Sequence, residues 1–190
     1  MKKKTAIIIH GWDGNPNIGW FVWLENELKK KGFNVIKPIM PNPAYPKIKP
    51  WVKKISEIAK NSNNDTIIIG HSIGCQAIIR YLETPEAKKF SKVIFVAPWL
   101  TLMDAAIDET ESYEIAKPWL ETKIDFKKVK FKMKKSTAIF STNDPFVSIR
   151  NKDKFKKELG SKIIIQKNKG HFEEGKTEKI PILLKEILED

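Results

Sequence analysis

The chain has 190 residues, of which 41% are hydrophobic and 31% are charged, with a formal net charge of +12 and one cysteine, Cys75. This length predicts one domain, residues 1–190, because domains of ~100–200 residues are the usual size. A solitary cysteine excludes an internal disulfide framework and fits a reducing compartment, so we expect a cytoplasmic protein.

The positive charge is carried almost entirely by lysine, since Arg80 and Arg150 are the only arginines. Recognition of bases and phosphates favours the forked guanidinium group, and the lysines are spread along the chain as on a solvated surface. The densest cluster, residues 127–135, alternates lysines with apolar residues, which predicts an extended amphipathic segment or a binding patch. Charge without a recognisable motif does not predict a nucleic-acid partner.

The start of the chain, residues 1–4, is basic like the first part of an export signal. The apolar run behind it, residues 6–9, stops at His10. An export signal needs an apolar run of ~7–15 residues and a membrane span needs about 20. We therefore expect neither export nor membrane insertion.

Stretches with strand character alternate with stretches of helical periodicity. Residues 5–9 form the first apolar, β-branched run, and residues 21–31 follow with apolar positions on one helix face. The further expected strands are residues 34–39, 66–69, 92–96, 137–141 and 162–166, and the further expected helices are residues 47–60, 72–82, 147–159 and 180–188. This alternation predicts an α/β fold with a parallel sheet of about six strands and helices on both faces.

Two irregular stretches interrupt the alternation. Residues 38–50 contain five prolines and must form a stiff loop. Residues 98–121 hold several large apolar side chains among acidic residues, which predicts a small lid of one or two short helices. Both stretches leave from the carboxyl ends of expected strands, where open α/β sheets bind ligands.

Residues 70–74 are Gly-His-Ser-Ile-Gly and lie between an expected strand and an expected helix. In this context G-x-S-x-G predicts a nucleophile elbow, a sharp turn that projects the serine oxygen from the sheet. The positive end of the following helix would favour an oxyanion there. Ser72 is therefore the expected nucleophile, and the alternative is a chance match at a helix N-cap, where serine is favoured anyway.

A serine nucleophile needs a base, and the base needs an acid that orients it. Among the three histidines, His71 is directed by the turn itself and His10 ends the first expected strand. The expected base is therefore His171, in the loop after the sixth expected strand. The expected acid is Asp144, just past the fifth, because the chain order Ser, Asp, His is that of α/β-hydrolases.

Other carboxylates compete for the role of the acid, since Asp144 precedes a proline and could simply initiate a turn. Asp104 and Asp108 follow the fourth expected strand, a less usual position for the acid. Asp125 precedes the fifth expected strand, and Asp153 lies within an expected helix.

Two backbone amides are expected to form an oxyanion hole. One belongs to Ile73, directly after the nucleophile, and the other to Trp12, in the loop after the first strand. The candidates for the substrate pocket are His10, Trp20, Trp99, Met103 and Trp119. For all five the alternative is structural: the histidine would support the oxyanion loop, and the others would pack in the core or hold the lid down.

Several motifs occur together and in order: His10-Gly11-Trp12, Trp20 with Trp23-Leu24, residues 70–74, Asn143-Asp144-Pro145 and Gly170-His171-Phe172. Over nearly its whole length the chain resembles the small serine hydrolases typified by the bacterial YdeN proteins and the human retinoblastoma-binding protein nine. The resemblance implies a minimal α/β-hydrolase fold with strand order 2-1-3-4-5-6, an esterase-like activity, a reduced lid, and neither metal nor organic cofactor. It also implies the roles expected for Ser72, Asp144 and His171.

The residues and the resemblance together predict a hydrolase that cleaves an ester, amide or thioester of a small substrate through an acyl-enzyme on Ser72. Acyltransferases use the same constellation, so the acceptor stays open. A second class of function also stays open: a non-catalytic module on a hydrolase fold that binds a protein partner through residues 98–121.

Overall fold

The computed structural model describes residues 3–63, 65–173 and 175–189, so Met1 and Lys2 of the basic start lie outside the described residues. Its centre is a six-stranded sheet in which every neighbouring pair of strands is parallel, in the order β2-β1-β3-β4-β5-β6. The strands are β1 (Thr5–Ile9), β2 (Asn34–Ile36), β3 (Ile67–His71), β4 (Lys92–Val96), β5 (Ser136–Ser141) and β6 (Lys162–Gln166). The expected sheet and its strand order are confirmed.

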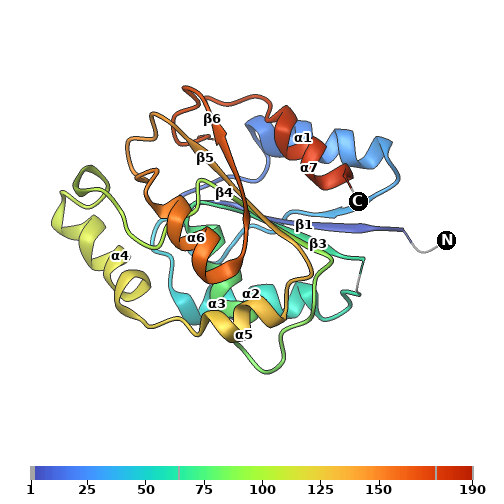
Figure 1. The fold of residues 1–190 in the computed structure, drawn as a ribbon, viewed down its shortest axis with the longest axis horizontal. Coiled ribbons are helices and arrows are strands. Elements are labelled where there is room, and N and C mark those ends of the chain that lie inside the picture. Colours follow the sequence, from blue (N-terminus) through green and yellow to red (C-terminus); the bar gives the residue numbers. More distant parts are fainter. Residues whose placement is uncertain (1–2, 64, 174, 190) are drawn as a thin grey trace.

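Helices cover both faces of this sheet (Figure 1). On one face lie α1 (Gly19–Lys30) and α7 (Pro181–Leu188). On the other lie α2 (Ile48–Ala59), α3 (Ile73–Leu82), α5 (Phe126–Phe131) and α6 (Asn151–Leu159). A short 3-10 helix, η1 (Asp104–Ala106), and α4 (Thr110–Glu121) lie in the connection between β4 and α5.

Alternate residues of each strand enter two separate hydrophobic cores. In β1, Ile7 and Ile9 belong to the core beneath α2, α3, α5 and α6, whereas Ala6 and Ile8 belong to the core beneath α1 and α7. All residues of β3 and β4 are buried, as expected for central strands of a sheet that is covered twice. The sheet is therefore a rigid support for the loops at its carboxyl edge.

For the lysine-rich stretch 127–135, the alternatives were an extended segment and a binding patch. The extended conformation is wrong for residues 127–131, which belong to α5 (Phe126–Phe131). The Asp125 side chain accepts a hydrogen bond from the Lys128 N–H and so caps the first turn. Val129 is buried, whereas Phe131 is 68% exposed. Phe126 and Val129, three positions apart, pack on the same core, whereas Phe131 does not. The exposed Phe131 made the pattern look like a strand alternation and so concealed the helix.

The expected strand over residues 34–39 is shorter in the structure and ends at Ile36. Pro38 follows closely, and a proline has no N–H for a strand ladder. Beyond it, the carbonyl oxygens of Pro41, Ala44 and Pro46 accept hydrogen bonds from three indole N–H groups. The proline-rich loop therefore serves as a set of acceptors that fixes neighbouring tryptophans.

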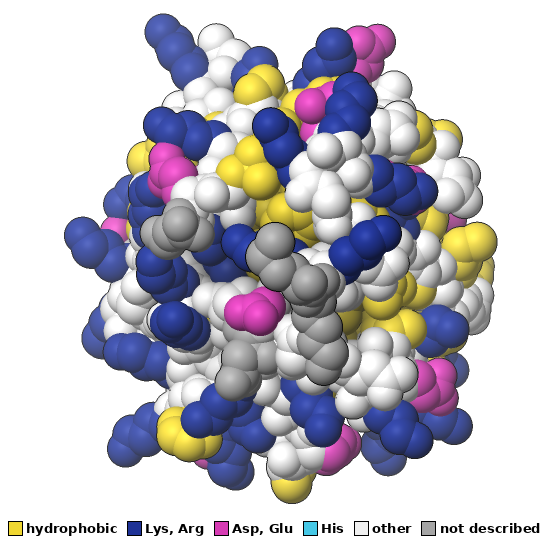
Figure 2. Space-filling model, turned by 90° about the vertical axis from the view of Figure 1, so that its right-hand side faces the viewer, with side chains coloured by type: hydrophobic (Ala, Val, Ile, Leu, Met, Phe, Trp, Pro, Cys, Tyr) yellow, Lys and Arg dark blue, Asp and Glu magenta, His cyan; other side chains and the backbone are white. Residues whose placement is uncertain are grey.

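Lysine side chains are scattered over the face on the right-hand side of Figure 1, with hydrophobic side chains between them and few acidic ones (Figure 2). Their spread over this face agrees with the wide spacing of lysines along the sequence. Of the helices in the described residues, none is both long and apolar enough to cross a membrane.

Candidate active site

Ser72 lies in the turn between β3 and α3, with φ 50° and ψ −121°. Such a positive φ is strained for a residue with a side chain, so the surrounding structure must enforce it. The two flanking glycines make the turn possible. A Cβ on Gly74 would lie 2.5 Å from the carbonyl oxygen of His10, and one on Gly70 would lie 2.8 Å from the amide nitrogen of Cys75. This is the geometry of a nucleophile elbow.

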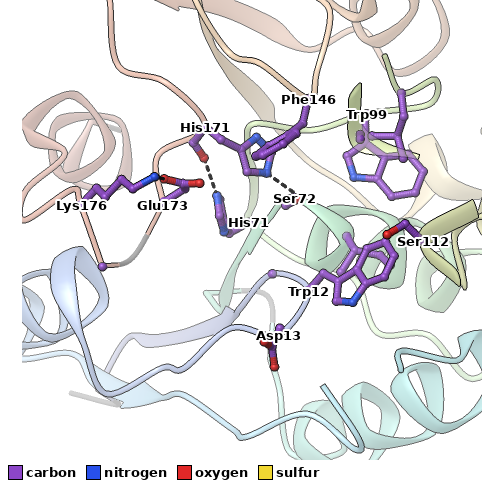
Figure 3. A pocket seen from close by; sticks show the side chains of 15 residues that line it. Trp12, Asp13, His71, Ser72, Trp99, Ser112, Phe146, His171, Glu173 and Lys176 are labelled. Carbon is purple, nitrogen blue, oxygen red and sulfur yellow. Dashed lines mark hydrogen bonds and ion pairs between the residues drawn. The ribbon is translucent and has the colours of Figure 1, made fainter. Parts of the chain in front are cut away.

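A chain of two hydrogen bonds links Ser72 to Asp144 through His171. Figure 3 shows the first of them, between His171 and Ser72. The Nε2 atom of His171 lies 2.9 Å from Ser72 Oγ, and its Nδ1 atom lies 2.8 Å from Asp144 Oδ2. An ionised carboxylate can only accept, so the Nδ1 proton points to Asp144 and Nε2 is left to accept the serine proton. The His171 and Asp144 side chains are 10% and 2% exposed, so water screens their interaction only weakly.

The second carboxylate oxygen of Asp144 is also occupied. Asp144 Oδ1 accepts from the backbone N–H groups of Phe146 at 2.9 Å and Val147 at 3.0 Å. These bonds form a local turn that fixes the orientation of the carboxylate toward His171. One side chain therefore both forms a turn and accepts a hydrogen bond from His171.

The competing carboxylates have other surroundings. Asp125 caps α5, and Asp153 pairs with Lys152 at 2.6 Å. Asp104 and Asp108 are exposed on the connection that follows β4. The carboxylate that contacts His171 is that of Asp144.

Two side chains at the end of β5 fix the start of the loop that carries His171. The N–H of Lys169 donates to Ser141 Oγ, and the N–H of Gly170 donates to Asn143 Oδ1, both at 2.9 Å. Ser141 Oγ in turn donates to Asn143 Oδ1 at 2.9 Å. The contacts of Ser141 and Asn143 were not predicted from the sequence, although both residues lie within three positions of Asp144.

The loop that follows β1 is held by His10 and by the proline-rich loop. His10 Nε2 accepts from the Met40 N–H at 2.9 Å, so Nδ1 donates to the Gly11 carbonyl at 2.7 Å. The Trp12 indole donates to Ala44 O at 2.8 Å. In the described part of the chain, the backbone N–H groups of Trp12 and Ile73 donate to no carbonyl oxygen.

A cavity of about 520 Å³ opens above Ser72 (Figure 3). Its apolar wall includes Trp12, Trp99, Leu102 and Phe146. Its polar lining includes Asp13, Ser112, Glu173 and Lys176. Glu173 and Lys176 form an ion pair of 2.6 Å and lie on the opposite side of Ser72 from Trp99.

Of the five side chains expected in the pocket, Trp99 lines this cavity, and the other four lie elsewhere. His10 accepts from the Met40 N–H behind the loop that follows β1, Trp20 donates to Phe172 O at 2.9 Å, and Trp119 donates to Pro46 O at 3.1 Å. Met103 is 41% exposed. His10, Trp20 and Trp119 therefore make the supporting and packing contacts that were the alternative to a place in the pocket.

Several lining residues were not expected from the sequence. Leu102, Ala106 and Ser112 come from the segment 98–121, and Phe146 follows Asp144 by two positions. Of these four, only Phe146 lies near one of the three expected catalytic residues in the sequence. Among the described residues, no group of three or more His, Cys, Asp or Glu side chains is placed to hold a metal ion.

Known proteins are similar to this chain in sequence and in fold. Residues 6–180 match the family model described as serine hydrolase. The chain is 34% identical to YdeN of Bacillus subtilis over 86 residues, a segment that spans 45% of each protein. It is 26% identical to the serine hydrolase RBBP9 of Rattus norvegicus over 99% of this chain and 98% of that protein.

The crystal structure of the ydeN gene product from B. subtilis superimposes with a TM-score of 0.87, at 23% identity, and the match covers 97% of each chain. This agreement concerns the fold, and the family follows from the sequence match over residues 6–180. The chain therefore belongs to the serine hydrolase family and is an enzyme with the α/β-hydrolase fold.

Proposed function

We propose that the enzyme hydrolyses carboxylic esters of small molecules through an acyl-enzyme on Ser72. His171 is the general base, and Asp144 is the acid that orients it. The observation that supports this most directly is the continuous chain of hydrogen bonds from Ser72 Oγ through His171 to Asp144, at 2.9 and 2.8 Å. Ser72 and His171, which form the first of these bonds, line the cavity of about 520 Å³. A serine that only begins a helix needs neither partner.

In the first half-reaction, Ser72 Oγ attacks the ester carbonyl carbon while His171 Nε2 takes its proton. The carbonyl π electrons move to oxygen, and a tetrahedral intermediate forms. When this intermediate collapses, the bond to the leaving alcohol breaks and His171 gives that alcohol its proton. Asp144 stays ionised throughout and stabilises the imidazolium that exists between the two proton transfers.

In the second half-reaction, water takes the place of the alcohol. His171 Nε2 removes a proton from water as its oxygen attacks the acyl carbon. The second tetrahedral intermediate releases the carboxylic acid, and the proton returns to Ser72 Oγ. An amine or alcohol acceptor would follow the same steps, so the nature of the acceptor depends on what enters the cavity.

The backbone amides of Trp12 and Ile73 are the proposed donors to both oxyanions. Both lie at the cavity, and neither donates to a carbonyl oxygen in the described residues. Donors that are already in place need no rearrangement when charge develops on the substrate oxygen. The bonds that His10 makes to Gly11 and Met40 would keep the first of these amides in position.

The acyl group is proposed to occupy the apolar side of the cavity, against Trp99, Leu102 and Phe146. Apolar and aromatic walls with a few polar groups are typical of sites for small organic ligands. Residues 98–121 would act as a lid, because Leu102, Ala106 and Ser112 of this segment line the cavity. The single, buried Cys75 favours a reducing, cytoplasmic location.

The proposal is tested with a fluorophosphonate probe, which reacts with activated serines. We expect the wild-type enzyme to be labelled once, at Ser72, and Ser72→Ala not to be labelled. Ser148, which is half-buried after β5, provides a matched control, since Ser148→Ala should be labelled like the wild type. A panel of p-nitrophenyl esters of increasing chain length then defines the acyl group.

The alternative, a non-catalytic module that binds a protein partner, gives the opposite result. It expects no labelling of the wild type and no ester turnover. Labelling that persists in Ser72→Ala would place the nucleophile elsewhere and contradict the proposed mechanism.

A further inference from the structure

Side chains from three other elements hold four consecutive residues around His171. Before the histidine, Ser141 and Asn143 accept hydrogen bonds from the N–H groups of residues 169 and 170. Two ring N–H groups then donate to the carbonyl oxygens of residues 171 and 172. His71 Nε2 donates to His171 O at 2.8 Å, and Trp20 Nε1 donates to Phe172 O at 2.9 Å.

His71 is the neighbour of the nucleophile, yet its side chain points to the backbone of the base, as Figure 3 shows. Its Nε2 must carry a proton, because a carbonyl oxygen can only accept. The side chain is buried and packs edge-on against Trp20, with ring centroids 5.9 Å apart, and against Phe21, at 6.3 Å. A Cβ on Gly11 would lie 2.9 Å from His71 Nδ1, so this glycine leaves room for the ring.

Trp20 makes the second contact from α1. Its indole is fully buried, so its N–H has a fixed direction. The carbonyl that it meets belongs to Phe172, which has φ 53°, and Gly170 on the other side of His171 has φ 55°. A left-handed conformation is unfavourable for phenylalanine and persists only where neighbouring contacts enforce it. The indole bond is such a contact.

We infer that His71 and Trp20 are positioning residues for the general base. By holding two consecutive carbonyl oxygens, they fix the backbone from which the His171 imidazole reaches Ser72 on one side and Asp144 on the other. The side chain of His71, the residue before Ser72, thereby links the nucleophile turn to the backbone of His171. This inference rests on the proposed function, because it assigns a role relative to the same triad.

The test uses variants that remove or keep each donor. His71→Leu removes the N–H, whereas His71→Gln keeps an amide N–H near the position of Nε2. Trp20→Phe removes the indole N–H but keeps an aromatic ring. Trp23→Phe is the matched control on the same helix, since the half-buried Trp23 indole packs against the same core without an indole hydrogen bond to another described residue.

We expect kcat per labelled site to fall by about 10- to 100-fold in His71→Leu and Trp20→Phe, because a displacement of about 1 Å can cost about 100-fold in rate. KM should stay within a few-fold of the wild-type value, and His71→Gln should recover most of kcat. End-point fluorophosphonate labelling counts the folded sites. A merely structural role would lower the labelled fraction and the melting temperature but not kcat per labelled site.

Three outcomes would overturn the inference: unchanged kcat per site in both donor-deleting variants, equal losses in His71→Leu and His71→Gln, or an equal loss in Trp23→Phe. Failure of the proposed function is distinguishable from all three, because the wild-type enzyme itself would then not be labelled at Ser72.

Discussion

His171 Nε2 lies 2.9 Å from Ser72 Oγ although 99 positions separate the two residues in the chain. The distance is short because β3 and β6 run in the same direction and their following loops meet at one edge of the sheet. Asp144 reaches the same point from the loop after β5. The sheet therefore determines which residues can meet, and the local turns determine how their side chains point.

The first prediction concerns the acid. Asp144→Asn should lower kcat on the order of 10⁴-fold, because an amide can favour the wrong tautomer of His171. The turn should survive, since the asparagine oxygen can still accept from the Phe146 and Val147 N–H groups. Steady-state kinetics and a melting curve check both parts.

The control for this prediction is Asp153→Asn, which should keep the wild-type kcat. A comparable loss of kcat in Asp104→Asn or Asp108→Asn, with Asp144→Asn active, would show that the acid is a different residue.

The second prediction concerns the elbow. Gly74→Ala should lower the free energy of unfolding by at least about 1–3 kcal/mol, the usual cost of overpacking. A Cβ at this position would lie 2.5 and 2.7 Å from the carbonyl oxygens of His10 and Ile9, and backbone atoms cannot easily move away. Gly175→Ala is the control, because a Cβ there meets nothing within 4 Å. Urea unfolding measures both variants, and equal stability would show that the backbone around Gly74 can move to accommodate a Cβ.

The third prediction concerns the acyl side of the cavity. Leu102→Trp should raise KM for long-chain p-nitrophenyl esters and leave that for the acetate nearly unchanged, because the larger ring takes space next to Trp99 and Phe146. The neighbouring Met103 is exposed and does not line the cavity, so Met103→Trp is a matched control. If both variants shift the chain-length preference equally, the acyl group lies elsewhere.

The fourth prediction concerns the anchoring of α4. The buried Arg80 guanidinium donates to the carbonyl oxygens of Trp119, Thr122 and Lys123 at the end of this helix. Burial lowers the pKa of Arg80, and nearby Glu83 opposes that shift. Arg80→Leu should destabilise the enzyme by about 1–3 kcal/mol or more, since buried carbonyls lose their donors.

This loss should also speed cleavage by a protease in residues 98–121, because the segment loses its attachment to α3. Limited proteolysis and urea unfolding provide the measurements. Arg150→Leu controls for the loss of an arginine at an exposed position. Equal protease resistance in Arg80→Leu and the wild type would show that other contacts hold the segment.

Much of this architecture could be predicted from the sequence because apolar, β-branched runs are strong local signals. The expected bounds of β1, β4 and β6 agree with the structure, and the G-x-S-x-G turn placed Ser72 between a strand and a helix. The contacts of His71 and Trp20 could not be predicted. Their partners are backbone carbonyls about 100 and 152 positions away, and no local pattern marks a carbonyl as an acceptor.

The cavity wall was also hard to predict, for a different physical reason. Which side chains of residues 98–121 face Ser72 depends on how a segment with one 3-10 turn and one helix folds back over the sheet. Met103 and Leu102 are adjacent in sequence and both apolar, yet of the two only Leu102 lines the cavity.

The central claim is that Ser72 carries an acyl group during turnover, and trapping that intermediate tests it most directly. The enzyme is mixed with p-nitrophenyl acetate, quenched in acid within the first turnover, digested and mapped by mass spectrometry. We predict one acetyl group on the peptide that contains Ser72, formed together with a burst of p-nitrophenol, and neither in Ser72→Ala. An acetyl group on another residue, or product formation by Ser72→Ala at the wild-type rate, would contradict the account.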